Sequence, residues 1–218
     1  QGIMPNSHAD SRTINLGTSY IKDHYRFGIG YRALEGFYGI PGFAQTSVMK
    51  HSHEPIQQPI EYQPINTRAL SHALYLSSVF TPPKKLIHPL QLDYSAQYAD
   101  DRELIGIYRV NKFTSHRHAL RMEAVQRFAK YWTALSGVDF CFLQLDGDGV
   151  RRYLPNTLTR DLGIFTTQSL NYESFSANFG YRRDWAQRRV TSDPEYKPSR
   201  GLAGGNLSAR DFSLNQLS

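Results

Sequence analysis

Cysteine is almost absent from this chain, and long hydrophobic runs are missing. Cys141 is the only cysteine among 218 residues, which excludes an internal disulfide framework and a zinc site built from several cysteines. No apolar run approaches the roughly 18 residues that a membrane-spanning helix requires; the cleanest one covers residues 138–143. We therefore expect neither a disulfide-stapled fold nor a transmembrane segment.

Motifs of catalysis and metal binding are also lacking. The chain contains no nucleophile elbow, no zinc-protease helix motif and no phosphate-binding loop. Histidines pair only at residues 51–53 and 116–118, without a third ligand at a suitable spacing. The acidic segment 146–149 fails as a calcium loop, because its sixth position is Arg151 instead of glycine. We expect no enzyme, no catalytic residue, no metal site and no cofactor.

The composition that is present suits a folded, basic protein rich in interface residues. Hydrophobic residues make up 40% of the chain and charged residues 20%, which is enough apolar material for a core. The formal net charge is +6, the isoelectric point is about 9.4, and there are 14 tyrosines. Arginine and tyrosine are enriched at protein interfaces. A basic surface of this size fits an acidic protein neighbour, RNA or lipid phosphate.

Periodic apolar residues predict two helices and one strand. Leu70, Leu74 and Phe80 recur at helical spacing, which predicts a helix over 67–80 that the prolines after it would end. A stronger stripe predicts a long amphipathic helix over 115–136, ending at Gly137. The apolar run 138–145 predicts a strand. The expected fold class is therefore an irregular α+β fold, with a small core around the long helix and the strand that follows it.

Both ends of the chain are expected to form extended arms. Glycine recurs through residues 1–65, and the segment 54–65 repeats proline followed by isoleucine, which is typical of a stiff polyproline-like arm. Its isoleucines Ile56, Ile60 and Ile65 need a surface to cover them, either the protein's own core or a partner's groove. We predict an arm over 1–65, a compact core over 66–181 and a basic-aromatic segment with an extended tail over 182–218.

Two basic-aromatic clusters are the other candidate interface residues. Arginines alternate with aromatic rings in both clusters, a pattern that can anchor a protein interface or grip RNA. The predicted members are Arg151, Arg152, Tyr153, Tyr181, Arg182, Arg183, Trp185, Arg188 and Arg189.

These observations predict a non-catalytic accessory subunit of a large multiprotein assembly, held by its arms. A mitochondrial respiratory-chain or ATP synthase complex is the predicted setting, since a basic chain with one thiol fits a mitochondrial location. The expected partners are other protein subunits, with RNA or anionic lipid as further candidates. The alternatives are an RNA-contacting protein, such as an organellar ribosomal protein, and a viral structural protein.

Overall fold

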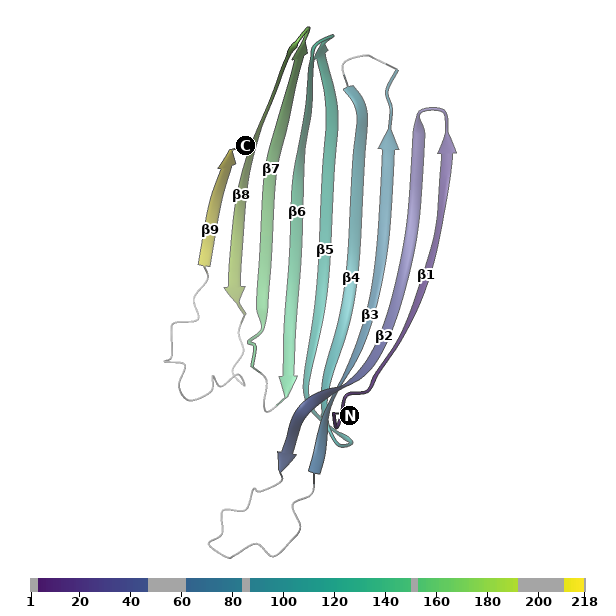
Figure 1. Cartoon of the computed structure of the whole chain (residues 1–218), viewed down its shortest axis with the longest axis vertical. Coiled ribbons are helices and arrows are strands. Elements are labelled where there is room, and N and C mark those ends of the chain that lie inside the picture. Colours follow the sequence, from purple (N-terminus) through teal and green to yellow (C-terminus); the bar gives the residue numbers. More distant parts are fainter. Residues whose placement is uncertain (1–3, 47–61, 84–86, 150–152, 192–209, 218) are drawn as a thin grey trace, which may run out of the picture.

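The chain forms a single antiparallel sheet. The structure is a computed structural model that describes residues 4–46, 62–83, 87–149, 153–191 and 210–217. Within these residues it contains nine strands, each hydrogen-bonded to the strands before and after it in the sequence (Figure 1). The strands are β1 (Ala9–Lys22), β2 (Tyr25–Thr46), β3 (Tyr62–Phe80), β4 (Ile87–Ile105), β5 (Tyr108–Ala129), β6 (Trp132–Gly149), β7 (Thr157–Tyr172), β8 (Phe175–Val190) and β9 (Arg210–Leu217).

Tight turns join neighbouring strands at both ends of the sheet. At the upper end in Figure 1, two-residue turns at 23–24, 130–131 and 173–174 join neighbouring strands. Asp23 and Glu173 adopt positive φ angles of 47° and 48°, as tight hairpin turns between twisted strands require. At the lower end, Gly106 at φ 59° serves the tight turn between β4 and β5.

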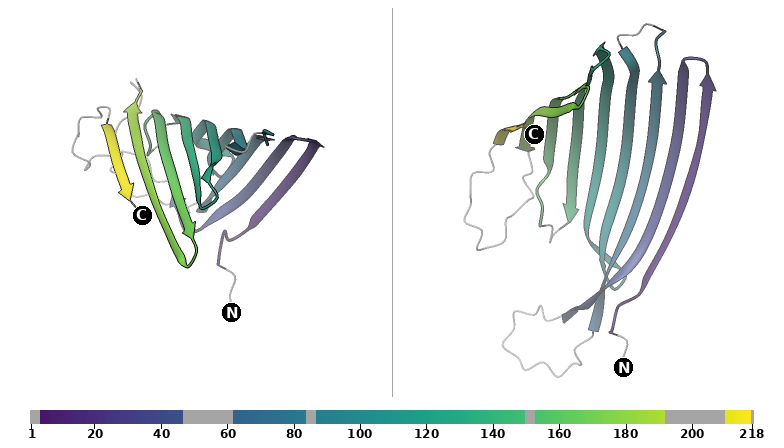
Figure 2. Two further views of the ribbon diagram at one scale, coloured as in Figure 1. Left: turned by 90° about the horizontal axis from the view of Figure 1, so that it is seen from above. Right: turned by 45° about the horizontal axis from the view of Figure 1, so that its top comes forward.

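The sheet is curved and has no second layer in the described part of the chain. Figure 2 shows it bending between its two edge strands. No large side chain among the described residues is fully buried; the most enclosed ones are small or polar, such as Ala73, Asn111 and Ala134. A single sheet needs another surface over its apolar face to make a core. This fold supplies none from its own described residues.

The expected α+β fold class is wrong. The predicted helix at 67–80 lies in β3, the predicted helix at 115–136 spans β5 and the start of β6, and the predicted strand at 138–145 lies within β6. In β3 the apolar residues Leu70, Leu74 and Leu76 occupy alternate positions on one face, and this spacing also matches a helical stripe at two of the three positions. Cross-strand pairing along the full length of both segments overrides their helical propensity.

The predicted extended arms are also corrected by the fold. β1 and β2 fall within residues 1–65, and β8 and β9 carry most of the described residues beyond 181; all four strands pair within the same sheet. β3 crosses the predicted boundary at residue 65, and β8 crosses the one at residue 181. As limits of separate domains, these two boundaries stay predictions.

Candidate functional site

The strand register separates the side chains into two chemically different faces. Successive residues of a strand point to opposite sides of a sheet, and directly paired residues share a side. One row of partners reads Ile29, Leu76, Tyr94, Leu120, Phe140, Leu162 and Trp185 across β2 to β8. The adjacent row reads Gly28, Ser77, Asp93, Arg121, Asp139, Gly163 and Asp184. We call the first side the apolar face and the second the polar face.

The apolar face is open to its surroundings over its whole centre. Leu120, Met122, Phe140, Leu162 and Ile164 lie side by side on β5, β6 and β7, and each exposes between 38% and 44% of its surface. The face continues over β1 and β2, where Ile14, Leu16 and Phe27 are exposed at 46% or more. A continuous apolar surface of this kind marks contact with a membrane or another molecule.

Tyrosine–histidine pairs follow the lower part of the apolar face. The Tyr31 hydroxyl lies 2.6 Å from His72 Nδ1, and the Tyr94 hydroxyl lies 2.8 Å from His118 Nδ1. The Tyr98 ring contacts the ring of His116, with 5.1 Å between centroids. Amphipathic rings of this kind gather where an apolar medium meets water.

Charged side chains take over immediately below these rings. Arg68 donates to Glu35 over 2.6 Å, and Asp100 is paired with both Arg102 and Lys112 at 2.6 and 3.2 Å. Asp100 is nearly buried at 3% exposure, because the two cations cover it. The lower part of this face therefore changes from apolar to ionic within a few residues.

The edge of the apolar region, which we call the apolar boundary, runs obliquely across the strands. It lies at Tyr98 on β4, Phe142 on β6, Leu162 on β7 and Trp185 on β8, each followed by a polar residue on the same face. The register partner of Tyr98, followed strand by strand to β8, is Arg189, four residues below Trp185. Four residues rise about 14 Å and four strand spacings cover about 19 Å, so the boundary is inclined by about 35° to the pairing direction.

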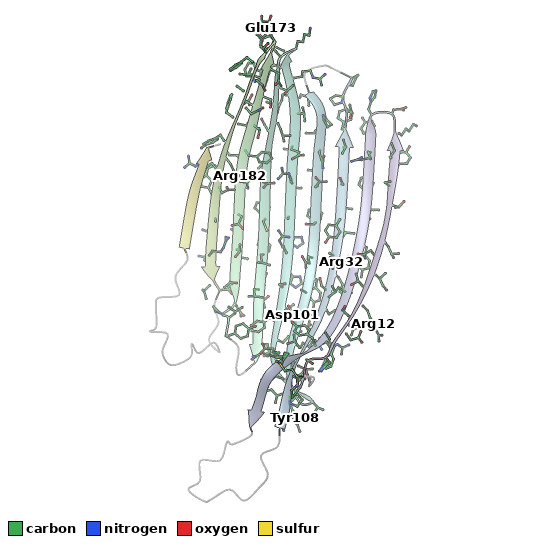
Figure 3. The ribbon with its side chains drawn as sticks, in the orientation of Figure 1. Arg12, Arg32, Asp101, Tyr108, Glu173 and Arg182 are labelled. Atoms are coloured by element: carbon green, nitrogen blue, oxygen red, sulfur yellow. The ribbon has the colours of Figure 1, made fainter. Side chains whose placement is uncertain are left out.

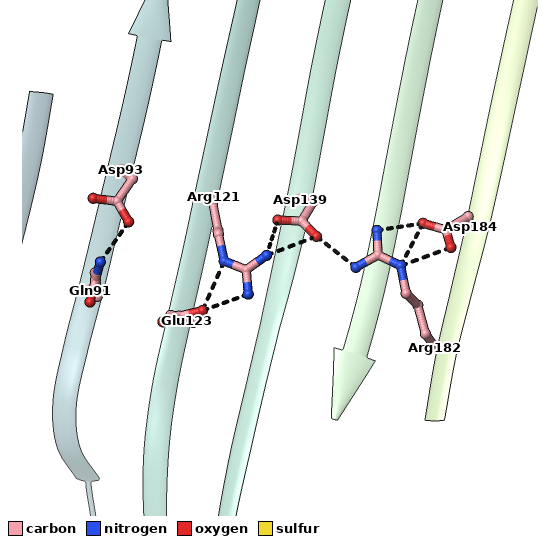
Figure 4. A network of polar contacts seen from close by, with 7 residues as sticks. All are labelled: Gln91, Asp93, Arg121, Glu123, Asp139, Arg182 and Asp184. Carbon is pink, nitrogen blue, oxygen red and sulfur yellow. Dashed lines mark hydrogen bonds and ion pairs between the residues drawn. The ribbon is translucent and has the colours of Figure 1, made fainter. Parts of the chain in front are cut away.

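The polar face carries a continuous line of alternating charges, which includes Arg182 on β8 (Figure 3, Figure 4). Arg121 donates to Glu123 at 2.8 Å and to Asp139 at 3.1 Å. Arg182 donates to the other oxygen of Asp139 at 2.8 Å and to Asp184 at 2.7 Å. The line joins β5, β6 and β8, and we call these five residues the charged line. Both of its guanidinium groups have carboxylate partners, and the three carboxylates leave the line with a net charge of −1.

The Phe165 ring and Gly137 shape the surface beneath the charged line. The guanidinium carbons of Arg121 and Arg182 lie 4.7 and 5.7 Å from the centre of the Phe165 ring. A Cβ at Gly137 would lie 2.5 Å from that ring and 2.6 Å from the Met122 carbonyl oxygen. Gly137 therefore leaves the space into which the ring packs.

A hollow of 540 Å³ lies along the polar face, over six consecutive strands. Its lining includes Tyr75, Asp93, Arg117, Cys141, Asp161 and members of the charged line. A hollow shared by strands β3 to β8 requires this side of the sheet to be concave. Concave, polar and charged, the face is suited to hold water and polar solutes.

The predicted interface residues do not form one site. Ile56, Ile60, Arg151 and Arg152 lie outside the described residues. Ile65 is half-buried in β3, where its carbonyl accepts a hydrogen bond of 2.7 Å from Asn6. Tyr153 follows β6 with its ring 4.9 Å from that of Phe113; reduced hydration, then the nearby carboxylate of Glu103, raise the pKa of its hydroxyl.

Strand β8 divides the second basic cluster between the two faces. Tyr181, Arg183, Trp185 and Arg189 belong to the apolar face, whereas Arg182 and Arg188 belong to the polar face. Arg188 pairs with Asp161, and Arg183 lies over the Trp185 ring at 5.0 Å. The alternation of residue types in 181–189 was the signal of a two-faced strand. Reading the segment as one patch missed it.

Sequence reasoning also missed the charged line and the apolar face. Asp139 lay in a segment read as a buried strand, and Arg121 lay in the segment read as a helix. Period-two alternation of large apolar residues at 120 and 122 on one strand and at 138, 140 and 142 on the next was the available signal.

Comparisons with known proteins give a likeness of fold. No protein-family model matches the chain, and no curated protein matches it. Among solved structures, a chain named "Copper transporter OprC" superposes with a TM-score of 0.64 at 13% sequence identity. The match covers 97% of this chain but 34% of that one, so this chain spans about a third of its length.

No helix long and apolar enough to cross a membrane occurs in the part of the chain that the structure describes. Within those same residues, no three side chains of histidine, cysteine, aspartate or glutamate are grouped as a metal site would require.

The fold corrects the predicted function and location. The all-β sheet, shared with a transporter, overturns the accessory subunit of a mitochondrial respiratory-chain or ATP synthase complex and the mitochondrial localisation. The ribosomal and viral alternatives assumed the same small core with arms, and they fall with it. The chain's open apolar face was read from the sequence as a need for protein neighbours, because period-two alternation was not recognised.

Proposed function

We propose that this sheet is a section of the wall of a membrane-spanning β-barrel that takes part in solute transport. The apolar face contacts lipid chains, and the concave polar face lines a water-filled lumen. The observation that carries the proposal is the opposition of the two faces: exposed leucine, isoleucine and phenylalanine on one side, and a line of paired charges above a hollow on the other. Barrels in membranes alternate in this way along every strand.

The dimensions of the apolar face support the proposal. On β4 the face runs from Leu90 to Tyr98, which is about 27 Å along the strand, or about 22 Å for strands inclined by about 35°. Transmembrane barrels carry an apolar band about 25 Å tall, with strands tilted by roughly 35–45°.

The two edges of the sheet fit a larger wall. Among the described strands, β1 pairs only with β2 and β9 only with β8. An unpaired strand edge in hydrocarbon leaves backbone N–H and C=O groups without partners, at a cost of several kcal/mol each. In our proposal, further antiparallel strands continue the wall from both edges.

The solute is proposed only as a polar one. The name of the solved structure includes copper, but copper sites use soft thiolate and thioether ligands or imidazoles. Among the residues that line the hollow, Cys141 has carboxylates but no second thiol, thioether or imidazole beside it, and the described part of the chain groups no three metal-binding side chains. We therefore propose passage of polar or charged solutes along the charged line, without a catalytic step.

Thiol accessibility tests the assignment of the two faces. In a Cys141→Ser background, the chain is folded into lipid vesicles with a cysteine either at Ala119, on the polar face, or at Leu120, on the apolar face. A water-soluble thiol reagent should modify residue 119 at least about tenfold faster, because a thiolate is disfavoured in hydrocarbon. Equal rates at both positions would contradict the proposal.

A further inference from the structure

A cationic group lies at the apolar boundary, two to four positions below the central row of the apolar face. Arg160 on β7 precedes Leu162 by two residues and lies next to it on the same face, and Arg189 on β8 lies four residues from Trp185. Gln187 is the direct partner of Arg160 and stands between Trp185 and Arg189. Arg160 and Arg189 are diagonal neighbours, whose Cβ atoms are about 7–8 Å apart.

Neither guanidinium has a carboxylate partner among the residues that the structure describes. Arg160 and Arg189 are both exposed, and no carboxylate among the side chains that the structure describes lies within ion-pair distance of either. Arg68, Arg121 and Arg182, by contrast, each have a carboxylate partner within 3.1 Å. Two uncompensated cations side by side repel each other unless an anion joins them.

A third arginine is directed toward the same place. Arg183 lies on the apolar side of Trp185, and its guanidinium carbon is 5.0 Å from the centre of the indole ring. Its Nε atom is enclosed and has no hydrogen-bond partner among the described groups. A charge on the lipid side of a barrel is costly near the bilayer centre, and long basic side chains bend toward the interface. Leaning over Trp185 brings Arg183 toward the apolar boundary.

We propose that Arg160 and Arg189, with Gln187 between them, bind the phosphate group of an anionic lipid at this membrane surface. Arginine binds phosphate through two parallel hydrogen bonds, and an indole at the boundary anchors the lipid's glycerol region. The lipid chains then lie on Leu162 and Phe142. The inference rests on the proposed membrane-spanning function and adds a partner to the apolar face.

Lipid retention tests the inference. The chain is folded into vesicles of equal parts phosphatidylcholine and phosphatidylglycerol, extracted in mild detergent, and its bound lipid is identified by native mass spectrometry. The wild-type chain should retain phosphatidylglycerol in about tenfold preference, given the attraction of basic residues to anionic lipid surfaces. The double variant Arg160→Gln, Arg189→Gln should lose this preference, and the variant with lysine at both positions should keep part of it.

A matched control removes the same charge from the other face. Arg117→Gln with Arg188→Gln changes two polar-face arginines and should leave the lipid preference within about twofold of wild type. Equal losses in both double variants would overturn the inference, as would equal retention of both lipids by the wild-type chain. Displacement of the lipid by an excess of inorganic phosphate would show that free phosphate is the ligand, and would also overturn it.

Folding and insertion are measured separately. Circular dichroism and quenching of Trp132 by lipids brominated on their chains should be the same for the double variant and the wild type. Loss of lipid preference with intact insertion supports the site. Insertion with no preference in the wild type contradicts this inference alone, and failure of the wild type to insert contradicts the proposed function itself.

Discussion

Gly137 shows how closely single residues on the polar face are fitted to their neighbours. It lies in β6 between Met122 of β5 and the Phe165 ring of β7. The ring in turn supports the guanidinium groups of Arg121 and Arg182. A side chain at residue 137 would act on the charged line through this ring. The arrangement of the polar face thus requires a glycine at residue 137 as well as the charged residues.

We expect Gly137→Ala to destabilise the folded chain by about 1–3 kcal/mol, the usual cost of overpacking. The new Cβ would meet the Met122 carbonyl, which the pairing of β5 with β6 holds in place, as well as the ring. Urea unfolding of the chain from lipid vesicles measures the change.

Gly28→Ala serves as the control for this measurement. A Cβ at residue 28 has no neighbour closer than 3.9 Å, so its effect should stay within about 0.5 kcal/mol, as for most unconstrained substitutions. A loss at residue 28 as large as that at residue 137 would show that glycine flexibility, and not the fit against Phe165, is what matters.

Strand β5 shows most directly what an element contributes to the two faces. Its residues alternate between Arg117, Ala119 and Arg121 on the polar face and His118, Leu120 and Met122 on the apolar face. Neighbouring residues of one strand are therefore expected to differ sharply in their tolerance of charge.

A lysine at residue 120 should be costly, whereas a lysine at residue 119 should not. On the lipid face of a barrel, a lysine near the midplane costs about 2–4 kcal/mol. Leu120 is exposed in the central row of the apolar face, and Ala119 lines the hollow beside Asp93 and Asp139. The free energy of unfolding from vesicles should decrease by about that amount for Leu120→Lys and by less than about 1 kcal/mol for Ala119→Lys. A larger loss for Ala119→Lys than for Leu120→Lys would show that the assignment of the two faces is reversed.

For individual secondary-structure elements, the sequence indicated where ordered segments occur but was misleading about whether they are helices or strands. Residues 67–80, 115–136 and 138–145 are all ordered, as their apolar patterns indicated. Alanine, leucine, methionine and arginine in β5 favour a helix locally, and its apolar residues at 118–125 fit both periods. Only the partners on β4 and β6, remote in sequence, decide between the two.

The candidate site was even less accessible to sequence reasoning. Arg121 and Arg182 are 61 positions apart along the chain, and the register of three strands brings both to Asp139. No local pattern encodes such a register. The basic-aromatic segment 181–189 was predicted to form an interface, which stays a prediction. Its division between two faces could be recognised only once β8 was known to be a strand.

For the whole molecule, the oblique apolar boundary sets how the sheet stands in a bilayer. Tyr98 and Leu158 belong to the same row of register partners, yet the boundary passes through Tyr98 and lies four residues above Leu158, at Leu162. In a membrane whose surface follows that boundary, Leu158 lies about 11 Å further out than Tyr98.

Depth-dependent quenching checks this inclination. Single tryptophans are placed at residue 98, 158 or 162 after Trp132 and Trp185 are changed to phenylalanine. Lipids brominated on their chains should quench Tyr98→Trp and Leu162→Trp to similar extents and Leu158→Trp much less. Similar quenching at 98 and 158, with 162 deeper than both, would place the strands upright and remove the inclination.

The order of the strands has a consequence for how such a wall can change size. Every described strand is hydrogen-bonded only to the strands next to it in the sequence, so each hairpin pairs with the rest of the sheet along its two outer strand edges. Duplicating or deleting one hairpin leaves the other strand pairings in register and preserves which residues meet lipid, while the diameter of the barrel changes with strand number. Channel width and surface chemistry can therefore be altered independently, one by the count of hairpins and the other by substitution.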